Sequence, residues 1–425
     1  MMFYLIIYNL ILFLLIPVLF GYWFHGRFVL GKYRFPLRLR LGFPGVKIQE
    51  GQKTILIHAV SVGETVAAQP FVEALRQKFP DSHLVFSTVT ETGQKRARQI
   101  IPADSFVFFP LDYRLCVHTF LDMLKVQKVY ILETEIWPNF LHICQQKGIE
   151  VIFVNARISD RSLKHYSLLR RLFRPLIRQI RFYAQTVEDA RRLEYLGAEH
   201  ISVAGNLKYD QLLRNLQSPV REILRSSLLH ISRERLVVLG SFHREEVLQA
   251  LDMFVQLKSI QSGWRFILAP RHMHFLKQYQ QYARDMDIDI LLRSEMQEGQ
   301  DFEVLLLDTY GELPLIYEHA RFCVVGGSFE AVGGHSILEP ALFGSVIFYG
   351  PNTQNFREVC EMFEQAGASR RIQSLRDLPE HLIVLDVESE TCAKMGSAAQ
   401  YLVRNSCGAT ERILGESATK SSGQA

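Results

Sequence analysis

From residue 54 onward, short apolar runs rich in β-branched and aromatic residues alternate with longer amphipathic stretches, such as 65–79 and 161–180. The apolar runs are 54–60, 83–89, 105–109, 128–132, 150–154, 181–186 and 201–204 and then, after a polar interval, 235–239, 264–269, 303–307, 321–325 and 345–349. Continuous apolar strands separated by helices are typical of parallel sheets covered on both faces. We therefore predict an α/β fold of two doubly wound, Rossmann-like domains with right-handed connections and a shared central cleft.

The chain length agrees with this division, because 425 residues exceed one ordinary domain. We expect an N-terminal domain over 54–205, a connection over 206–233, a C-terminal domain over 234–414 and a disordered polar tail over 415–425. Apolar residues make up 48% of the chain, which excludes a disordered protein. The net charge of +4 is too small to indicate a nucleic-acid binder. The six cysteines form no CxxC pair, so neither a zinc site nor a disulfide framework is indicated.

The N-terminal segment is strongly apolar. Residues 2–20 contain Asn9 as their one strongly polar residue, and about 20 apolar residues in a helix can span a bilayer core. We expect a membrane-anchor helix over 1–22 and a basic segment over 23–53 that contacts an anionic membrane surface. Because Lys and Arg follow the apolar run and no acid precedes Glu50, the rest of the chain is expected on the cytoplasmic side of the membrane. A helix lying in one leaflet and a buried helix of a soluble domain remain alternatives.

Two motifs in the first half place carboxylates at strand ends. In HAVSVGE (58–64), Gly63 permits a tight turn and Glu64 falls at the start of a helix, where it either complements the helix dipole or acts as a base. Ser61 suggests a nucleophile elbow, but Ala59 replaces the first glycine of that motif. In LETEIWPN (132–139), Glu133 ends a strand; an unpaired carboxylate there is costly, so we expect it to face a crevice or a partner.

A third strand of this half, which ends in NARISDRS (155–162), adds polar groups at the same edge. GNLKYD (205–210) then places Lys208 near the expected hinge, as a surface lysine or as a cation facing a phosphate. Three successive strands thus deliver polar residues to one edge, which is how α/β folds build a site.

The second half contains the strongest single signal, VVGGSFEAVGGHSILEP (324–340). This segment predicts a strand, a glycine-rich loop and a helix, an arrangement whose free N–H groups suit an anion. Glu339, one turn into the helix, is within reach of ribose hydroxyls, and the absence of GxGxxG argues against a dinucleotide. In APRHMHF (269–275), Arg271 is placed to clamp a phosphate, whereas His272 and His274 have poor spacing for one metal ion.

Eight ordered motifs now make the chain recognisable. HAVSVGET, LETEIWPN, NARISDRS, GNLKYD, LAPRH, DTYGELP, VVGGSFEAVGGHSILEP and GPNTQNF resemble the 3-deoxy-D-manno-octulosonic acid (Kdo) transferases, collinearly from the N-terminal segment to about residue 410. The resemblance implies a GT-B glycosyltransferase fold, CMP-Kdo as donor and a lipid A precursor as acceptor. It also implies inverting chemistry without a metal or other cofactor, at the cytoplasmic face of the inner membrane.

The resemblance also implies roles for individual residues. Glu64 matches the general base of the family, and Glu133 and Lys208 match the residues that stabilise the transition state. The segments that match the CMP-binding positions are Pro270 and Arg271, then Tyr310, Gly311 and Glu312, then Ser336, Ile337, Leu338 and Glu339. Further cleft candidates are Ser61, Gly63, Gly327, Ser328, Gly334 and Asn355. The chain departs from the family pattern at Ser336, Tyr310 and Met273, where Asn, Met and Pro are common, and these changes bear on local CMP contacts.

Two other functions fit parts of this pattern. A glycoside hydrolase could use Glu64 and Glu133 as its paired acids, and would need no nucleotide loop. A non-catalytic membrane protein that senses a nucleotide would need the loop but not Glu64.

Overall fold

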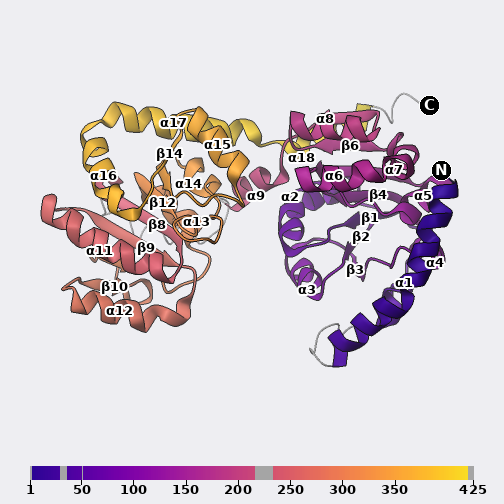
Figure 1. Ribbon diagram of the computed structural model, residues 1–425, viewed down its shortest axis with the longest axis horizontal. Coiled ribbons are helices and arrows are strands. Elements are labelled where there is room, and N and C mark those ends of the chain that lie inside the picture. Colours follow the sequence, from indigo (N-terminus) through magenta and orange to yellow (C-terminus); the bar gives the residue numbers. More distant parts are fainter. Residues whose placement is uncertain (1, 29–35, 50, 216–232, 420–425) are drawn as a thin grey trace. The chain divides into compact units, whose positions relative to one another are not determined.

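The computed structural model describes residues 2–28, 36–49, 51–215 and 233–419. They form two compact units (Figure 1). The first unit contains Met1–Gln211 together with Cys407–Ala425, and the second contains Leu212–Ser406. The prediction of two doubly wound α/β domains is confirmed by the two parallel sheets described below.

The first unit is built on a seven-stranded parallel sheet of order β3-β2-β1-β4-β5-β6-β7. Its strands are β1 (Thr54–His58), β2 (His83–Thr88), β3 (Ser105–Phe108), β4 (Val126–Leu132), β5 (Glu150–Ala156), β6 (Arg181–Ala184) and β7 (His200–Val203). Alternate residues of the central strands face opposite sides: Leu56 enters one apolar cluster, whereas Ile55 and Ile57 enter another. Both faces are therefore covered, as the continuous apolar runs predict.

Helices cover the two faces of this sheet (Figure 1). They are α1 (Met2–Phe28), α2 (Val62–Lys78), α3 (Glu91–Ile100), α4 (Arg114–Leu124), α5 (Pro138–Gln146), α6 (Asp160–Leu168), α7 (Arg170–Ile177), α8 (Val187–Leu196), α9 (Leu207–Asn215) and α18 (Ala409–Thr419). The single helical stretch expected over 161–180 is divided into α6 and α7, with Leu169 between them.

The second unit repeats the architecture with the sheet order β10-β11-β9-β8-β12-β13-β14. Its strands are β8 (Leu236–Phe242), β9 (Arg265–Pro270), β10 (Ile290–Leu292), β11 (Val304–Leu306), β12 (Phe322–Val325), β13 (Val346–Tyr349) and β14 (Ser369–Arg371). Its helices are α11 (Arg244–Ile260), α12 (Leu276–Asp285), α13 (Leu313–Ile316), α14 (Leu338–Leu342), α15 (Arg357–Gln365), α16 (Leu378–Val387) and α17 (Ser389–Ser406). Apolar clusters again lie on both faces of the sheet.

Strand order reverses at one point in each sheet, between β1 and β4 in the first unit and between β8 and β12 in the second. In doubly wound sheets, neighbouring strands at this point send their connections to opposite faces, which opens a crevice at their carboxyl ends. The segments that follow β1 and β4 contain Glu64 and Glu133, and the segment that follows β12 is the glycine-rich loop. The topology thus predicts that these three segments border the crevices at the switch points.

The C-terminal end differs from the expected boundaries. Residues 409–414 were expected in the second domain and 415–425 in a disordered tail, but α18 continues to Thr419 and belongs to the first unit. Its Ile413 and Leu414 enter an apolar cluster of the first unit, and Asp210 accepts hydrogen bonds from Gly408 N and Thr410 N, both at 2.7 Å. Burying these two side chains offsets the cost of ordering a polar segment. Residues 420–425 and most of the predicted connection, 216–232, lie outside the described residues.

The N-terminal helix α1 packs along the first unit (Figure 1). Asn9, the polar residue of the apolar run, exchanges side-chain hydrogen bonds of 3.0 Å with Asn139, and the Tyr8 hydroxyl donates to Asp112 at 2.9 Å. In the described part of the chain, we find no helix with the length and apolarity needed to cross a membrane. The anchor over 1–22 stays a prediction, and residues 29–35 and 50 of the basic segment lie outside the described residues.

Candidate functional site

Glu64 lies at the start of α2, directly beyond the carboxyl end of β1. Its carboxylate accepts hydrogen bonds from Val60 N at 2.8 Å and Ser61 N at 3.2 Å, while Ser61 Oγ accepts Glu64 N at 3.2 Å. This reciprocal capping box explains why the sequence starts a helix here. Ser61 is thereby used as a helix cap, and the adjacent Gly63 is exposed in the first turn. A carboxylate oxygen can accept about two hydrogen bonds, so each Glu64 oxygen retains capacity for a further donor.

Glu133 follows β4 in a left-handed backbone conformation, with φ of 56°. A non-glycine residue in this region is strained, and such strain is frequent at functional sites. Burial raises the pKa of Glu133, and the Glu64 carboxylate raises it further, whereas Lys208 and Arg157 act in the opposite direction. These mutual effects place Glu64, Glu133 and Lys208 in one electrostatic cluster, so the structure brings the three predicted catalytic residues together.

Glu135, two residues after Glu133, is a third carboxylate of this cluster. The pKa of Glu135 is raised to about 7 by burial and then by Glu64 and Glu133. The N-cap of α5 is Trp137 and has no side-chain cap hydrogen bond, so capping does not account for Glu135. The sequence shows that Glu135 lies two residues after Glu133, but it does not show the burial that couples the two acids.

A buried amide network holds Lys208 at the edge of the sheet. Asn155, 1% exposed and also left-handed at φ 58°, accepts Leu207 N at its Oδ1 at 3.0 Å. Its carbonyl oxygen accepts Gln185 Nε2 at 3.0 Å, and Gln185 Oε1 accepts Asn206 Nδ2 at 2.9 Å. The network therefore fixes the start of α9, whose second residue is the exposed Lys208. Sequence reasoning quoted Asn155 in a motif but assigned it no role.

In the second unit, the glycine-rich loop after β12 is held by Glu246, which is fully buried in the first turn of α11. Its carboxylate accepts His243 N at 2.8 Å, Gly327 N at 2.8 Å and Phe329 N at 3.0 Å. Gly327 adopts φ 68°, and a Cβ atom there would lie 2.8 Å from the His335 ring. Glycine is thus required both by the backbone conformation and by the close approach. Glu246 is a residue that the sequence interpretation missed.

The other loop candidates mainly brace this loop. Ser328 is buried, with its hydroxyl donating to Val325 O at 2.5 Å and accepting Gly350 N at 2.8 Å. Gly334 N donates to Gly327 O at 2.7 Å. Asn355 N donates to Gly333 O at 2.9 Å, and Asn355 Nδ2 to Val332 O at 3.1 Å. These bonds fold the loop back on itself and set the direction of its remaining N–H groups.

Two histidines meet beside this loop. The Nε2 atoms of His243 and His335 lie 3.1 Å apart, and their rings stack at 5.4 Å. The pKa of His335 is lowered to about 4 by burial and by the nearby His243 and Arg271, so His335 is neutral at pH 7. Arg271 itself is exposed, directly after Pro270 at the end of β9. The loop, His335 and Arg271 together form a surface with hydrogen-bond donors and one permanent positive charge.

The remaining predicted nucleotide contacts are spread over two segments. Ser336, Ile337, Leu338 and Glu339 lead into α14, and Ile337 and Leu338 are buried, so these two contribute backbone and packing. Burial raises the pKa of Glu339 to about 7. Tyr310 is 83% exposed after β11, Gly311 adopts φ 85°, and Glu312 pairs with Arg293 at 3.2 Å. Among the described residues, no group of three or more His, Cys, Asp or Glu has an arrangement suited to a metal ion.

Comparison with known proteins agrees with both the fold and the motifs. A family model described as 3-deoxy-D-manno-octulosonic-acid transferase (kdotransferase) matches residues 36–211, which contain all seven strands of the first sheet and the acidic cluster. A 3-deoxy-D-manno-octulosonic acid transferase of Haemophilus influenzae is 29% identical over 90% of this chain and 91% of its own. A protein of the same description from Bordetella pertussis is 28% identical over 85% and 86%.

A crystal structure of UDP-GlcNAc 2-epimerase from Neisseria meningitidis supports the fold alone. It has a TM-score of 0.57 and 15% identity, and covers 83% of this chain and 98% of its own. The two Kdo transferase relatives, by contrast, extend over most of this chain and most of their own length. Over most of its length the chain is thus similar to 3-deoxy-D-manno-octulosonic acid (Kdo) transferases, which are glycosyltransferases, and residues 36–211 match the model of that family.

Proposed function

We propose that this protein transfers Kdo from CMP-Kdo to a lipid A precursor, with inversion at the anomeric carbon and without a metal, in lipopolysaccharide biosynthesis at the cytoplasmic face of the inner membrane. The observation that carries the proposal is the cluster that Glu64 and Glu133, at the switch point of the first sheet, form with Lys208. It lies within the segment that matches the family model. The names of the relatives support Kdo as the transferred sugar.

The first unit would activate the acceptor. Glu64 takes the proton from the attacking sugar hydroxyl, because its carboxylate is held in place by two backbone N–H groups and retains free acceptor capacity. Glu133 interacts electrostatically with both Glu64 and Lys208, so its carboxylate can hold the lysine ammonium close to Glu64. Lys208 then offers an exposed ammonium to the negative charge that develops on the leaving nucleotide.

The second unit would hold the donor. CMP-Kdo carries a phosphodiester and a carboxylate, and departure of CMP adds a further negative charge to the phosphate. The permanent charge of Arg271, the neutral imidazole of His335 and the N–H groups of the glycine-rich loop are suited to these anions. Glu339, at the start of α14, would accept hydrogen bonds from the ribose hydroxyls.

The direct test is mass spectrometry of the lipid formed from CMP-Kdo and a tetraacylated lipid A precursor. We expect Kdo-modified lipid, the same yield after chelation of divalent metal ions, and an anomeric configuration opposite to that of the donor. Release of free Kdo without modified lipid would favour a hydrolase that uses Glu64 and Glu133. Binding of CMP with no turnover on either acceptor or water would favour a nucleotide sensor.

A further inference from the structure

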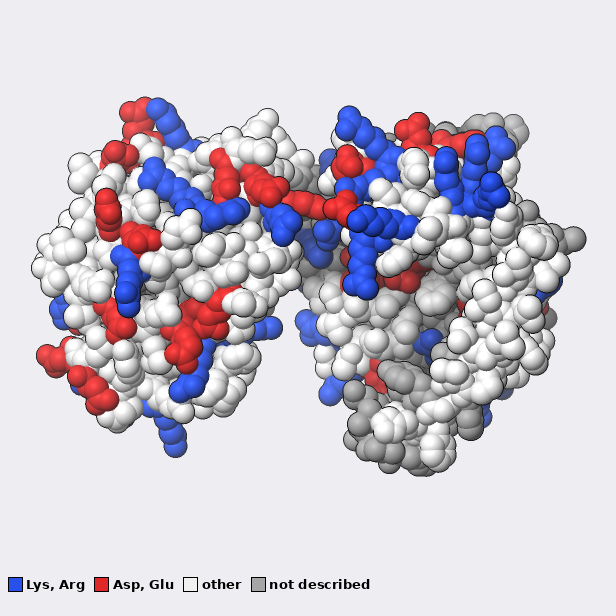
Figure 2. All heavy atoms as spheres, viewed as in Figure 1, with Lys and Arg blue, Asp and Glu red and all other residues white. Residues whose placement is uncertain are grey.

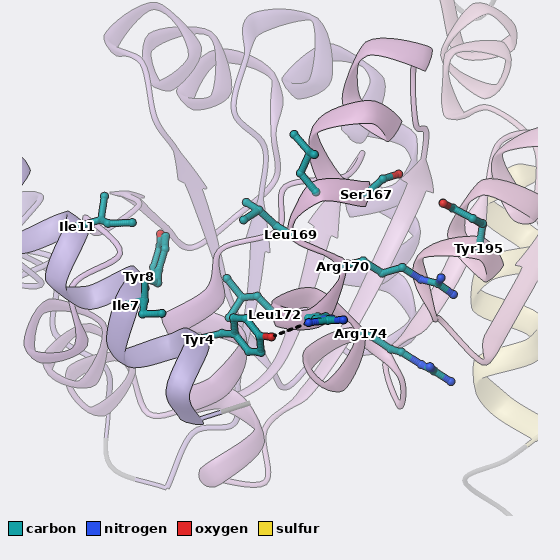
Figure 3. A pocket seen from close by; sticks show the side chains of 12 residues that line it. Tyr4, Ile7, Tyr8, Ile11, Ser167, Leu169, Arg170, Leu172, Arg174 and Tyr195 are labelled. Carbon is teal, nitrogen blue, oxygen red and sulfur yellow. Dashed lines mark hydrogen bonds between the residues drawn. The ribbon is translucent and has the colours of Figure 1, made fainter.

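A pocket of about 900 Å³ in the first unit lies between α1 and the junction of α6 and α7 (Figure 3). Its volume falls within the range of roughly 300–1,000 Å³ that is usual for small-molecule sites. Ile7 and Ile11 of α1 form one wall, and Leu169 and Leu172 also line the pocket, between α1 and the arginines of α7 in Figure 3. None of the twelve lining residues belongs to the loops that hold the acidic cluster, so the proposed base and its neighbours lie outside this pocket.

The opposite wall is cationic. Arg170 and Arg174 extend from α7 toward the side of Tyr195, away from α1 (Figure 3), and Arg171 Nη1 lies 3.5 Å from Tyr4 Oη. Within the described residues, these three arginines form no ion pair, and the pocket lining contains no acid. Arg178, one turn further along the chain, differs because Glu199 pairs with it at 2.7 Å.

Arg170 is the most constrained of these cations. Its guanidinium lies 4.8 Å from the centre of the Tyr195 ring, and its Nε atom is buried without a hydrogen-bond partner. A buried donor without an acceptor is costly, and a ligand oxygen would remove that cost. Arg170 and Arg174 also border an adjoining pocket of about 540 Å³, which contains Glu194 and the already paired Glu199.

The surface around the pocket is likewise divided into a cationic side and an apolar side. Figure 2 shows Lys and Arg gathered over α6, α7 and α8 and an uncharged surface along α1. On α1, Phe3, Leu10 and Leu14 are 57–68% exposed, beside the Ile7 and Ile11 that enter the pocket. A ligand that fits this surface has an apolar chain and an anionic head.

We propose that this pocket binds one molecule of an anionic glycerophospholipid of the bilayer. The acyl chain lies against Ile7, Ile11 and Leu172, and the phosphate contacts Arg170 and Arg174. Guanidinium groups bind phosphate through paired hydrogen bonds, and the removal of each methylene group from water favours the bound state. The apolar wall selects a lipid over a free anion, and the arginines select an anionic head over a zwitterionic one.

Native mass spectrometry of the full-length chain in nonionic detergent tests this proposal, with phosphatidylglycerol or phosphatidylcholine added in turn. We expect one retained phosphatidylglycerol per chain and at least tenfold less phosphatidylcholine. The double variant Arg170→Gln/Arg174→Gln should lose this selectivity, and Leu169→Gln should weaken retention of the lipid several-fold. Arg178→Gln is the matched control, because it removes a neighbouring arginine whose charge is already paired.

A single variant, a headgroup without acyl chains and a competing lipid each test one part of this proposal. Arg174→Gln alone, with a thermal melt unchanged from the parent, must still lower retention; unchanged retention overturns the proposal. Equal retention of both phospholipids also overturns it, as does retention of glycerophosphoglycerol, the headgroup alone, at the level of the lipid. If the lipid A precursor displaces phosphatidylglycerol at a tenth of its concentration, the pocket is an acceptor subsite and the assignment to a bilayer lipid is wrong. None of these readouts depends on Kdo transfer.

Discussion

The two units place a glutamate at the same structural position and use it differently. Glu64 and Glu246 each lie in the first turn of the helix that follows the first strand of their sheet, and each accepts backbone N–H groups from the turn before it. Glu64 is 9% exposed and accepts two such bonds, both local. Glu246 is 0% exposed and accepts three, two of them from a loop more than 80 residues away.

The difference shows what turns a helix-capping carboxylate into a candidate base. A capping box stabilises the charged carboxylate in both cases, by a contribution of about 1 kcal/mol. At Glu64, both accepted bonds come from the adjacent turn, so its oxygens keep capacity for a further hydrogen-bond donor beside Glu133 and Glu135. At Glu246, the loop consumes that capacity, so the carboxylate serves to position Gly327 and Phe329.

The largest expected effect follows from Glu64→Gln. If Glu64 is the base, transfer falls by about 10²- to 10⁴-fold, because the amide cannot take the hydroxyl proton. CMP affinity, measured by calorimetry, should stay within about twofold, since the nucleotide is proposed to bind the other unit. Ser61→Ala is the control: it removes the reciprocal cap, which is worth about 1 kcal/mol, but keeps the carboxylate. Comparable loss of turnover in both variants would assign Glu64 to capping rather than chemistry.

Glu246→Gln should show the opposite pattern. The amide can accept only part of the three N–H groups, and each buried donor left unpaired costs about 1–3 kcal/mol. We expect the free energy of unfolding to fall by about 2–3 kcal/mol in denaturant titrations, and CMP affinity to fall at least tenfold as the loop loosens. The exposed neighbour Glu245 provides Glu245→Gln as the matched control. Normal CMP binding by a folded Glu246→Gln protein would show that the loop holds its shape without this carboxylate.

Sequence patterns predicted most of this architecture for a physical reason. Buried parallel strands need continuous apolar runs, and strand ends followed by polar motifs mark the carboxyl edge, so Glu64, Glu133 and Lys208 could be placed near that edge before any coordinates. Their catalytic roles were implied by the family resemblance and not by these patterns. Glu246 and Asn155 could not, because their roles arise from hydrogen bonds to residues 81 and 52 positions away. The position of α18 was missed for the same reason: its partners, Asp210 and Lys78, are distant in the chain.

Asn155→Gly tests whether the first unit depends on positioning as the second does. Glycine adopts the φ of 58° without strain but removes the acceptor for Leu207 N, so α9 and Lys208 lose their fixed start. We expect kcat to fall about tenfold, which corresponds to about 1.4 kcal/mol, with the KM for CMP-Kdo nearly constant. Asp287→Gly, at a nearly equal φ of 56° but in the second unit, controls for the backbone change. If instead kcat is unchanged and only the KM for CMP-Kdo rises, a positioning role toward Lys208 is contradicted.

The smallest expected effect concerns Glu135 and the pH dependence of stability. Its pKa is about 7 in the folded protein and near 4.5 in an unfolded chain, so the folded state binds the proton more tightly. Stability is therefore fully supported below about pH 4.5 and is lost as the pH rises toward 7, when Glu135 ionises beside Glu64 and Glu133. Each pKa unit corresponds to about 1.4 kcal/mol, and partial exposure reduces the total to about 1–2 kcal/mol.

Glu135→Gln removes this ionisation, so its free energy of unfolding at pH 8 should exceed that of the parent by that amount, while the two converge near pH 5. The exposed Glu194→Gln should leave the profile unchanged. A Glu135→Gln protein less stable than the parent at pH 8 would mean that the charged carboxylate is paired rather than repelled, and that the acidic cluster of the first unit, like Glu246 in the second, is held by its partners.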